Sequence, residues 1–208
     1  MSVEMLEKEI NMASGRQNQP PAKKDYEREA RLSFLQLDDK ARSAIRQFRP
    51  VLEKNMDKVL DAFYAHATSV PKLSSLINNA KVSIAHLKQV QSMHWLNLFN
   101  AEFNESYMEK VSSIGRAHER IGLEPRWYLG GYCLALCCLI RLAIKKHWWQ
   151  PTKCCEVVTS IVKGIFCDME LAITLYNDMI RETSVSKLQQ AVDQINKNIN
   201  DCQKRYSS

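Results

Sequence analysis

The sequence has little of what builds sheets, zinc sites or disulfide frameworks. Glycine and proline each occur only 6 times in 208 residues, and strand-like alternation of apolar and polar residues is almost absent. None of the 7 cysteines forms a CxxC pair, so the spacing favours neither a zinc site nor a disulfide framework. We therefore expect reduced cysteines that pack in the core as small hydrophobic side chains.

The sequence also lacks a leader peptide, an apolar run of bilayer length and a block of basic residues. It begins with the charged segment MSVEMLEKEI, and its longest apolar run, in LGGYCLALCCLI, spans about twelve residues. A transmembrane helix needs roughly 20. The net charge of +6 comes from basic residues interleaved with acids. We expect a cytoplasmic protein with no membrane insertion and no nucleic-acid partner.

What the sequence does contain is helical periodicity. Hydrophobic residues make up 45% of it, enough for one sizeable core, and apolar positions recur every three or four residues. We predict an all-α domain over residues 25–181, preceded by a flexible arm over residues 1–24 that includes ASGRQNQPPAKK. The predicted helices begin at or near Asp25, Asp39, Pro50, Pro71, Val82, Phe103, Pro125 and Pro151.

The last segment, residues 182–208, follows a heptad pattern. Its apolar positions are separated by alternating steps of three and four residues, which is typical of a coiled coil. We expect a coiled-coil linker that leads to an output domain absent from this chain; the alternative is a terminal amphipathic helix folded on the domain. The seam consists of Val185, Leu188, Val192, Ile195, Ile199 and Cys202.

One histidine closes an apolar helix face. Apolar residues from Phe103 onward are spaced by 4, 4, 3 and 4 up to His118, so they share one face, and a glycine stop follows. A buried imidazole needs a hydrogen-bond partner or a metal. An inward Tyr64 and the pair Trp127 and Tyr128 favour a haem pocket, since haem iron is commonly held by a proximal histidine. On the residues alone, a satisfied core histidine and a haem ligand both stay open.

A resemblance to a known family bears on this choice. We find that residues 114–132, IGRAHERIGLEPRWYLGGY, closely resemble the proximal region of globin-coupled sensors, the haem-binding globins of bacterial signalling proteins. Two further segments resemble the distal part of that family, VLDAFYAHATSVPKLSSLI and IAHLKQVQSMHWLNLF. The resemblance covers roughly Leu32 to Arg181. It implies a globin fold with an extra N-terminal helix and no D helix, and haem b as the cofactor.

The resemblance also implies roles for single residues. His118 falls on the position of the iron ligand, with Tyr128 close enough to influence it. Tyr64 falls on the distal tyrosine that donates a hydrogen bond to bound O2. The haem is expected between the helices of residues 84–99 and 103–118. The other residues expected to contact it are Phe63, Leu87, Val90 and Trp127.

The distal helix departs from the family pattern in one place. Val90 stands where some relatives carry a threonine, and valine cannot donate a hydrogen bond. His86 and His94 lie one helical turn to either side, and we expect them at the surface or at the haem edge rather than on the iron. Gln91 is a further polar neighbour, and which of the three reaches the distal pocket stays open.

We predict a haem-based gas sensor rather than an enzyme, with O2 as the first candidate ligand and CO and NO as others. The helices of residues 129–144 and 157–176 are apolar on more than one face, which favours a homodimer. Residues 147–149, HWW, either cap a helix or join that interface. The expected output is a chemotaxis transducer, reached through the coiled coil. The rival interpretations are a globin enzyme with nitric oxide dioxygenase or peroxidase activity, and a haem-free interaction module.

Overall fold

The computed structural model describes residues 21–206, which form seven helices and no strand. The all-α prediction is therefore confirmed for these residues. The first helix begins at Pro21, earlier than predicted, and the rest of the predicted arm, residues 1–20, lies outside the described residues. Residues 26–174 form one compact unit, and the chain from Leu175 belongs to a second. The helices are α2 Pro21–Phe34, α3 Asp39–Ser69, α4 Pro71–Asn79, α5 Ile84–Leu98, α6 Glu105–Arg120, α7 Pro125–His147 and α8 Pro151–Tyr206.

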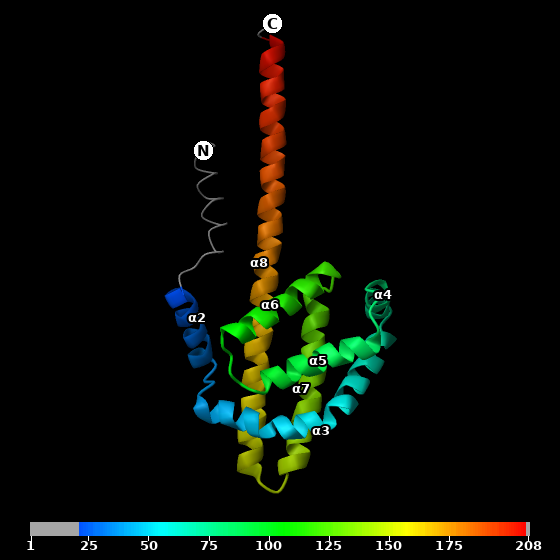
Figure 1. Cartoon of the computed structure of the whole chain (residues 1–208), viewed down its shortest axis with the longest axis vertical. Helices are drawn as coiled ribbons and strands as arrows, with labels where there is room; N and C mark the ends of the chain where they lie inside the picture. The colour runs from blue at the N-terminus through cyan, green and yellow to red at the C-terminus, as the bar shows by residue number, and fades with distance from the viewer. Residues whose placement is uncertain (1–20, 207–208) are drawn as a thin grey trace. The chain divides into compact units, whose positions relative to one another are not determined.

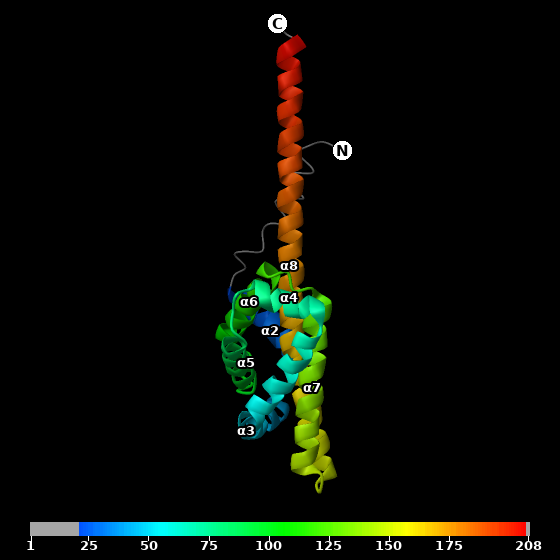
Figure 2. The same cartoon turned by 90° about the vertical axis from the view of Figure 1, so that its right-hand side faces the viewer.

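Within the first unit, α7 and the first part of α8 run antiparallel, side by side (Figure 1). Figures 1 and 2 show α5 and α6 on one face of this pair. Gly164 of α8 lies against α3, because a Cβ there would stand only 2.9 Å from Cδ1 of Ile45. The pair is thus the base on which the other helices pack. Its buried apolar residues recur at helical spacing and include Ala135, Leu139, Ala143, Val157, Ile161 and Ile165.

α3 is one helix of 31 residues, where the sequence predicted a break before Pro50. An interior proline removes a backbone hydrogen bond and costs about 3 kcal/mol. The helix continues because its buried face is unbroken across the proline, and each fully buried side chain contributes about 1.5–3 kcal/mol. α3 is bent in Figure 1, as helices that contain a proline commonly are. The buried residues on either side of Pro50 are Ile45, Phe48, Leu52 and Met56.

Side-chain caps fix the starts of three helices and correct one predicted boundary. Each cap accepts a hydrogen bond from the backbone N–H three residues later, which satisfies a group that the helix leaves unpaired. α6 begins at Glu105, after its cap, so Phe103 lies before the helix, with a φ of 48°. Phe103 is still buried, so the predicted apolar face is kept. The caps are Asp38, Ser83 and Asn104, at 2.8, 3.2 and 2.9 Å from their donors.

The cysteines only partly follow the prediction. The six described cysteines are free thiols, as expected, but only Cys167 is buried. Cys133, Cys137 and Cys155 are exposed, so the prediction of core packing is wrong for these three. The apolar pattern of α7 runs around the helix, and this unit buries only one side of it. An apolar neighbourhood in the sequence therefore did not guarantee burial.

Among the described helices, α7 alone is long and apolar enough to cross a membrane by length and composition, a test that core helices of globular proteins also pass. It is a longer segment than the apolar run counted in the sequence. α7 packs against α3 and buries four side chains, yet it also carries exposed apolar residues. One side of α7 is therefore core and the other is an open apolar surface. The exposed residues on it include Leu129, Leu134 and Ile144.

In the second unit, α8 continues without a break to Tyr206. The predicted seam is exposed at Leu188, Ile195 and Ile199, with 52%, 56% and 49% of each residue accessible. The side chain of Cys202, the last predicted seam position, lies outside the described residues. An apolar stripe on a long, polar helix is therefore accessible to a partner.

Candidate functional site

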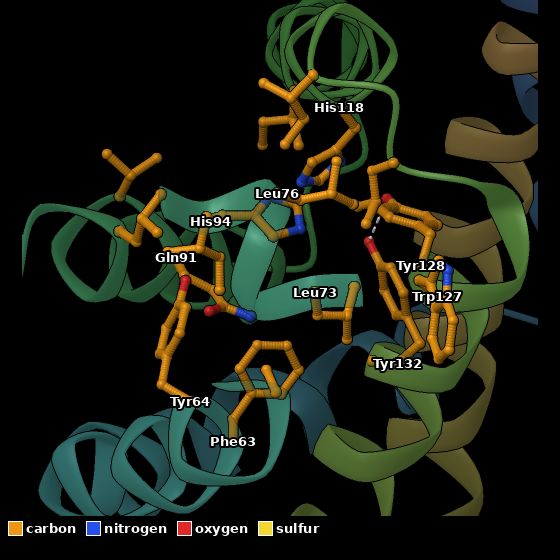
Figure 3. Close-up of a pocket in the computed structure, with 18 of the residues that line it drawn as sticks. Phe63, Tyr64, Leu73, Leu76, Gln91, His94, His118, Trp127, Tyr128 and Tyr132 are labelled. Carbon is orange, nitrogen blue, oxygen red and sulfur yellow. Dashed lines mark hydrogen bonds between the residues drawn. The ribbon is translucent and has the colours of Figure 1, made fainter. Parts of the chain in front are cut away.

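A cavity of about 230 Å³ lies among α3, α4, α5, α6 and α7. Figure 3 shows His118 on one side of it and Tyr64 and Phe63 on the side opposite. The fold thus brings together side chains from segments far apart in the sequence. All seven residues predicted to contact a cofactor line this cavity: Phe63, Tyr64, Leu87, Val90, His118, Trp127 and Tyr128.

His118 lies in the last turn of α6, and the backbone fixes it there. The N–H groups of Gly122 and Leu123 donate to the carbonyls of Glu119 and His118, at 2.8 and 2.9 Å. This pair of bonds is a Schellman motif, which closes a helix at a left-handed residue. Gly122 has a φ of 70°, which glycine adopts at little cost. The predicted glycine stop is therefore confirmed, and it anchors the turn that carries the histidine.

The His118 imidazole is neutral and has an unpartnered nitrogen. Its Nδ1 is buried and has no hydrogen-bond partner among the described residues. Burial, and then the neighbouring His94, lower the pKa of His118 from 6.5 to about 4. At pH 7 the ring is therefore neutral and offers a lone pair, which is the form that binds a metal. These properties fit the axial haem ligand expected from the sequence.

Phe63 and Tyr64 form the wall opposite His118. Their rings meet edge to face, with centroids 5.1 Å apart and an interplanar angle of 84°. Burial raises the pKa of Tyr64 to about 12, so its hydroxyl keeps its proton at neutral pH. Figure 3 shows the Tyr64 ring extending from α3 toward α5. The hydroxyl can therefore donate a hydrogen bond to a polar ligand in the cavity.

The wall formed by α5 combines apolar and polar side chains. Val90 lines the cavity but has no donor, whereas Gln91 lines it with a buried Oε1 that has no described partner. His94 also lines the cavity and is not a surface residue; a carboxylate of α8, 3.0 Å away, holds it inward. The side chain of His86 is exposed and is not among the lining residues.

A buried acid behind the cavity escaped prediction from the sequence. Asp168 of α8 is fully buried and accepts hydrogen bonds from the hydroxyls of Tyr107 and Tyr132 and from Nε2 of His94. Tyr132 lines the cavity, and its oxygen lies 2.8 Å from that of Tyr128. A continuous set of hydrogen bonds therefore runs from the cavity wall into α8.

The sequence held a signal for this acid. Asp168 continues the stripe of Ile161 and Ile165 at steps of four and three, so its position indicates burial. A buried carboxylate requires partners, which makes such a position a candidate for a polar cluster.

Other residues line the cavity although nothing in the sequence indicated that their segments would reach it. α4 and the turn after α6 contribute apolar side chains that close the cavity. Gly131 of α7 also lines it, and a Cβ there would stand 3.3 Å from Cε2 of Phe63. The added apolar residues are Leu73, Leu76, Ile77, Ile121 and Leu123.

The described residues form an all-α domain in which a histidine and a tyrosine from different helices face one apolar cavity, as in a globin. Its fold is similar to that of the globin domain of Geobacter sulfurreducens globin-coupled sensor, with a TM-score of 0.66. That match covers 71% of this chain and 96% of the other at 16% identity, so it concerns the fold alone. The globin fold predicted from the sequence is confirmed.

The sequence matches the Protoglobin family over residues 24–182, and the chain belongs to that family. It is also 32% identical over 102 residues to the heme-based aerotactic transducer HemAT of Halobacterium salinarum. The match covers 49% of this chain but only 21% of that relative. The resemblance to globin-coupled sensors found in the sequence is thus confirmed. Both similar proteins are named as a transducer or a sensor, which agrees with the prediction of a chain that is not an enzyme.

Proposed function

We propose that this chain is the haem-binding, gas-sensing domain of a signalling protein. The observation that carries the proposal is the neutral His118 imidazole, whose buried Nδ1 has no described partner, in the wall of an apolar cavity. The transducer from Halobacterium salinarum, itself named as heme-based, supports it.

In this proposal His118 binds the iron of haem b. Haem supplies an iron that coordinates a diatomic gas reversibly. The protein supplies a neutral nitrogen ligand and a dry pocket, since the walls from α3, α5 and α7 are largely apolar. The residues that would contact the macrocycle are Phe63, Leu87, Val90, Trp127 and Tyr128, all of which line the cavity.

Tyr64 is the residue we propose to discriminate among gases. Its hydroxyl is protonated at neutral pH, as that of an ordinary tyrosine is, and burial raises its pKa further, to about 12. A hydrogen bond to a charged acceptor contributes about 1.5–3 kcal/mol. O2 becomes more polarised than CO when it binds, so it gains more from this donor. We therefore propose O2 as the main ligand, with CO and NO as further ligands.

The first test is a titration of the haem-free protein with haem, followed by absorption. The parent is expected to take up haem stoichiometrically and, once reduced, to change its spectrum reversibly with O2. His118→Ala is expected to lose tight uptake. His86→Ala is the matched control, because His86 lies on α5 with an exposed side chain outside the cavity.

Two outcomes would count against the proposal. A parent chain that takes up no haem would contradict it and favour a haem-free interaction module. Tight, unchanged uptake by His118→Ala would leave the haem function standing but remove His118 as the ligand.

We further propose that two copies pair through the open faces of α7 and α8. Contiguous exposed apolar surface marks association sites, and cysteines with exposed thiols lie on the same two helices. Trp148 and Trp149 are 71% and 56% exposed, which favours the interface over the alternative of helix-end packing. The exposed apolar residues of these faces are Leu129, Leu134, Ile144 and Phe166.

The gas signal would pass from this sensor domain, residues 25–181, through the linker of residues 182–208. A ligand shifts a two-state equilibrium only if it binds the two states with different affinity. The exposed seam of α8 is suited to carry such a shift to an output such as a cytoplasmic chemotaxis transducer.

A further inference from the structure

Asp168 is a charged side chain that the fold buries completely. Its Oδ1 accepts a hydrogen bond from Tyr107, and its Oδ2 accepts one from Tyr132 and one from Nε2 of His94, which lies 3.0 Å away. Burial of an unpaired carboxylate is strongly unfavourable, and here three donors replace the lost water. The cluster is thus organised around the charge of Asp168.

The carboxylate keeps its charge in this setting. Burial alone would raise the pKa of Asp168, but the neighbouring His94 and the hydrogen bonds that it and the two tyrosines donate outweigh burial and hold the pKa below its usual value. An ionised carboxylate only accepts, so Tyr132 gives its single hydroxyl hydrogen to Asp168. Tyr128 must then donate to the Tyr132 oxygen, at 2.8 Å. The direction of the chain of bonds is therefore fixed, from Tyr128 through Tyr132 to Asp168.

The three donors come from three helices that enclose the cavity. His94 lies on α5, Tyr107 on α6 and Tyr132 on α7. His94 and Tyr132 line the cavity themselves. One carboxylate on α8 is thus bonded to three of the helices around the pocket, α5, α6 and α7.

One branch of this cluster ends at the proposed haem ligand. The Tyr128 ring packs against the His118 ring, with centroids 5.1 Å apart (Figure 3). The path from α8 to His118 therefore contains two hydrogen bonds and one ring contact. A gas can bind at the iron without this set of contacts, so the contacts need an explanation of their own.

We propose that Asp168 is a positioning residue that orients Tyr132 and Tyr128 against His118 and so sets how firmly His118 holds the iron. The inference rests on the proposed haem function.

Asp168→Asn is the direct test. Asparagine has the same shape, but its amide nitrogen donates, so it cannot accept all three bonds. With haem bound, we expect a shifted iron–histidine stretching frequency in the resonance Raman spectrum of the reduced protein. We also expect haem affinity to fall about 10–100-fold, the range for groups that orient a metal ligand. Tyr132→Phe cuts the same branch and should shift the frequency in the same direction; it carries the test if Asp168→Asn does not fold.

Two controls separate positioning from general loosening of the core. Ser160→Ala removes another buried polar group of α8, whose hydroxyl donates to the Glu156 carbonyl at 2.7 Å, and should leave the frequency unchanged. Tyr107→Phe removes a donor to Asp168 on the branch that does not reach Tyr128. It should lower stability but keep the frequency close to that of the parent. Equal shifts in Tyr107→Phe and Tyr132→Phe would overturn the positioning role.

A measurement on the haem-free protein tests the cluster by itself. The hydroxyl protons that Tyr107 and Tyr132 give to Asp168 should appear as downfield proton NMR signals. Each signal should vanish in one phenylalanine variant, and at least one of the two should vanish in Asp168→Asn, whose amide nitrogen cannot accept. Two unchanged signals in Asp168→Asn would overturn the inference.

The two proposals fail in different ways. A parent chain that takes up no haem removes the proposed function, and the positioning role falls with it. Haem uptake through His118, with frequency and affinity unchanged in Asp168→Asn and Tyr132→Phe, overturns the positioning role alone.

Discussion

The ring of His118 packs edge to face against that of Tyr128, with centroids 5.1 Å apart and an interplanar angle of 64°. The Tyr128 hydroxyl is hydrogen-bonded to that of Tyr132, with the two oxygens 2.8 Å apart. Among the described residues Nδ1 of His118 has no hydrogen-bond partner, so the ring contact with Tyr128 is the described interaction that can orient the imidazole.

The haem-free chain is expected to lose stability as the pH falls from about 6.5 to about 4. The pKa of His118 is about 4 in the folded chain and about 6.5 when unfolded, so the unfolded chain takes up the proton first. Stability contributed by the neutral ring is complete above this window and lost below it. At about 1.4 kcal/mol per pH unit, the loss is on the order of 3 kcal/mol. Urea unfolding at a series of pH values measures it.

The control for this prediction replaces the titrating ring. His118→Asn should flatten the profile between about pH 4 and 6.5, while His66→Asn, at an exposed position of α3, should leave it unchanged. A slope that survives in His118→Asn would assign the pH dependence to other groups.

Tyr64→Phe is expected to speed O2 dissociation by about tenfold to a hundredfold, because it removes a hydrogen bond worth about 1.5–3 kcal/mol. The ring that packs on Phe63 is kept, so the shape of the wall is unchanged. CO dissociation should change much less. Stopped-flow displacement measures both rates, with Tyr26→Phe as the control, since Tyr26 is 74% exposed. Equal acceleration for both gases would point to a steric effect instead of the lost donor.

Gly131→Ala is expected to weaken haem uptake while leaving the haem-free fold at least as stable. A Cβ there stands 3.3 Å from Cε2 of Phe63, whose ring lines the cavity and would be pushed toward it. Alanine is favoured over glycine inside a helix by about 1 kcal/mol. Gly130→Ala has the same gain and no atom within 4 Å of its new Cβ, so it should leave haem uptake unchanged. Equal haem affinity in the two variants would show that Phe63 yields without narrowing the site.

The sequence predicts that His118 and Tyr64 point inward, because the spacing of apolar residues indicates which face of a helix is buried. His118 and Tyr64 each stand in an apolar helical pattern, which indicates that they point into the core. Spacing does not predict that the face with His118 and the face with Tyr64 lie on opposite sides of one cavity. The resemblance to globin-coupled sensors provided that prediction. The break expected at Pro50 shows the limit of local rules, because burial of a continuous apolar face outweighed the missing hydrogen bond.

The cluster around Asp168 could not be predicted in the same way. Its position in an apolar stripe indicates burial, but its partners lie on three other helices that only the fold brings together. His94 shows the consequence. Spacing places it one turn after Val90, whereas its actual direction is set by a carboxylate 74 residues further along the chain.

The exposed seam of α8 is expected to hold two copies together. Leu188 and Ile195 are 52% and 56% exposed in the single chain, so a partner helix can bury a large part of each. Full burial of such a side chain contributes about 1.5–3 kcal/mol. Replacing both by asparagine should therefore weaken dimer formation by on the order of a hundredfold, as measured by sedimentation equilibrium.

The matched control places asparagine at Lys187 and Gln194, one residue before each seam position and off the apolar stripe. This variant should dimerise like the parent, because neither side chain enters a heptad core. If the seam variant dimerises as tightly as the control, the tail does not hold the copies together. The open face of α7, with Leu129, Leu134 and Ile144, would then be the surface to test next.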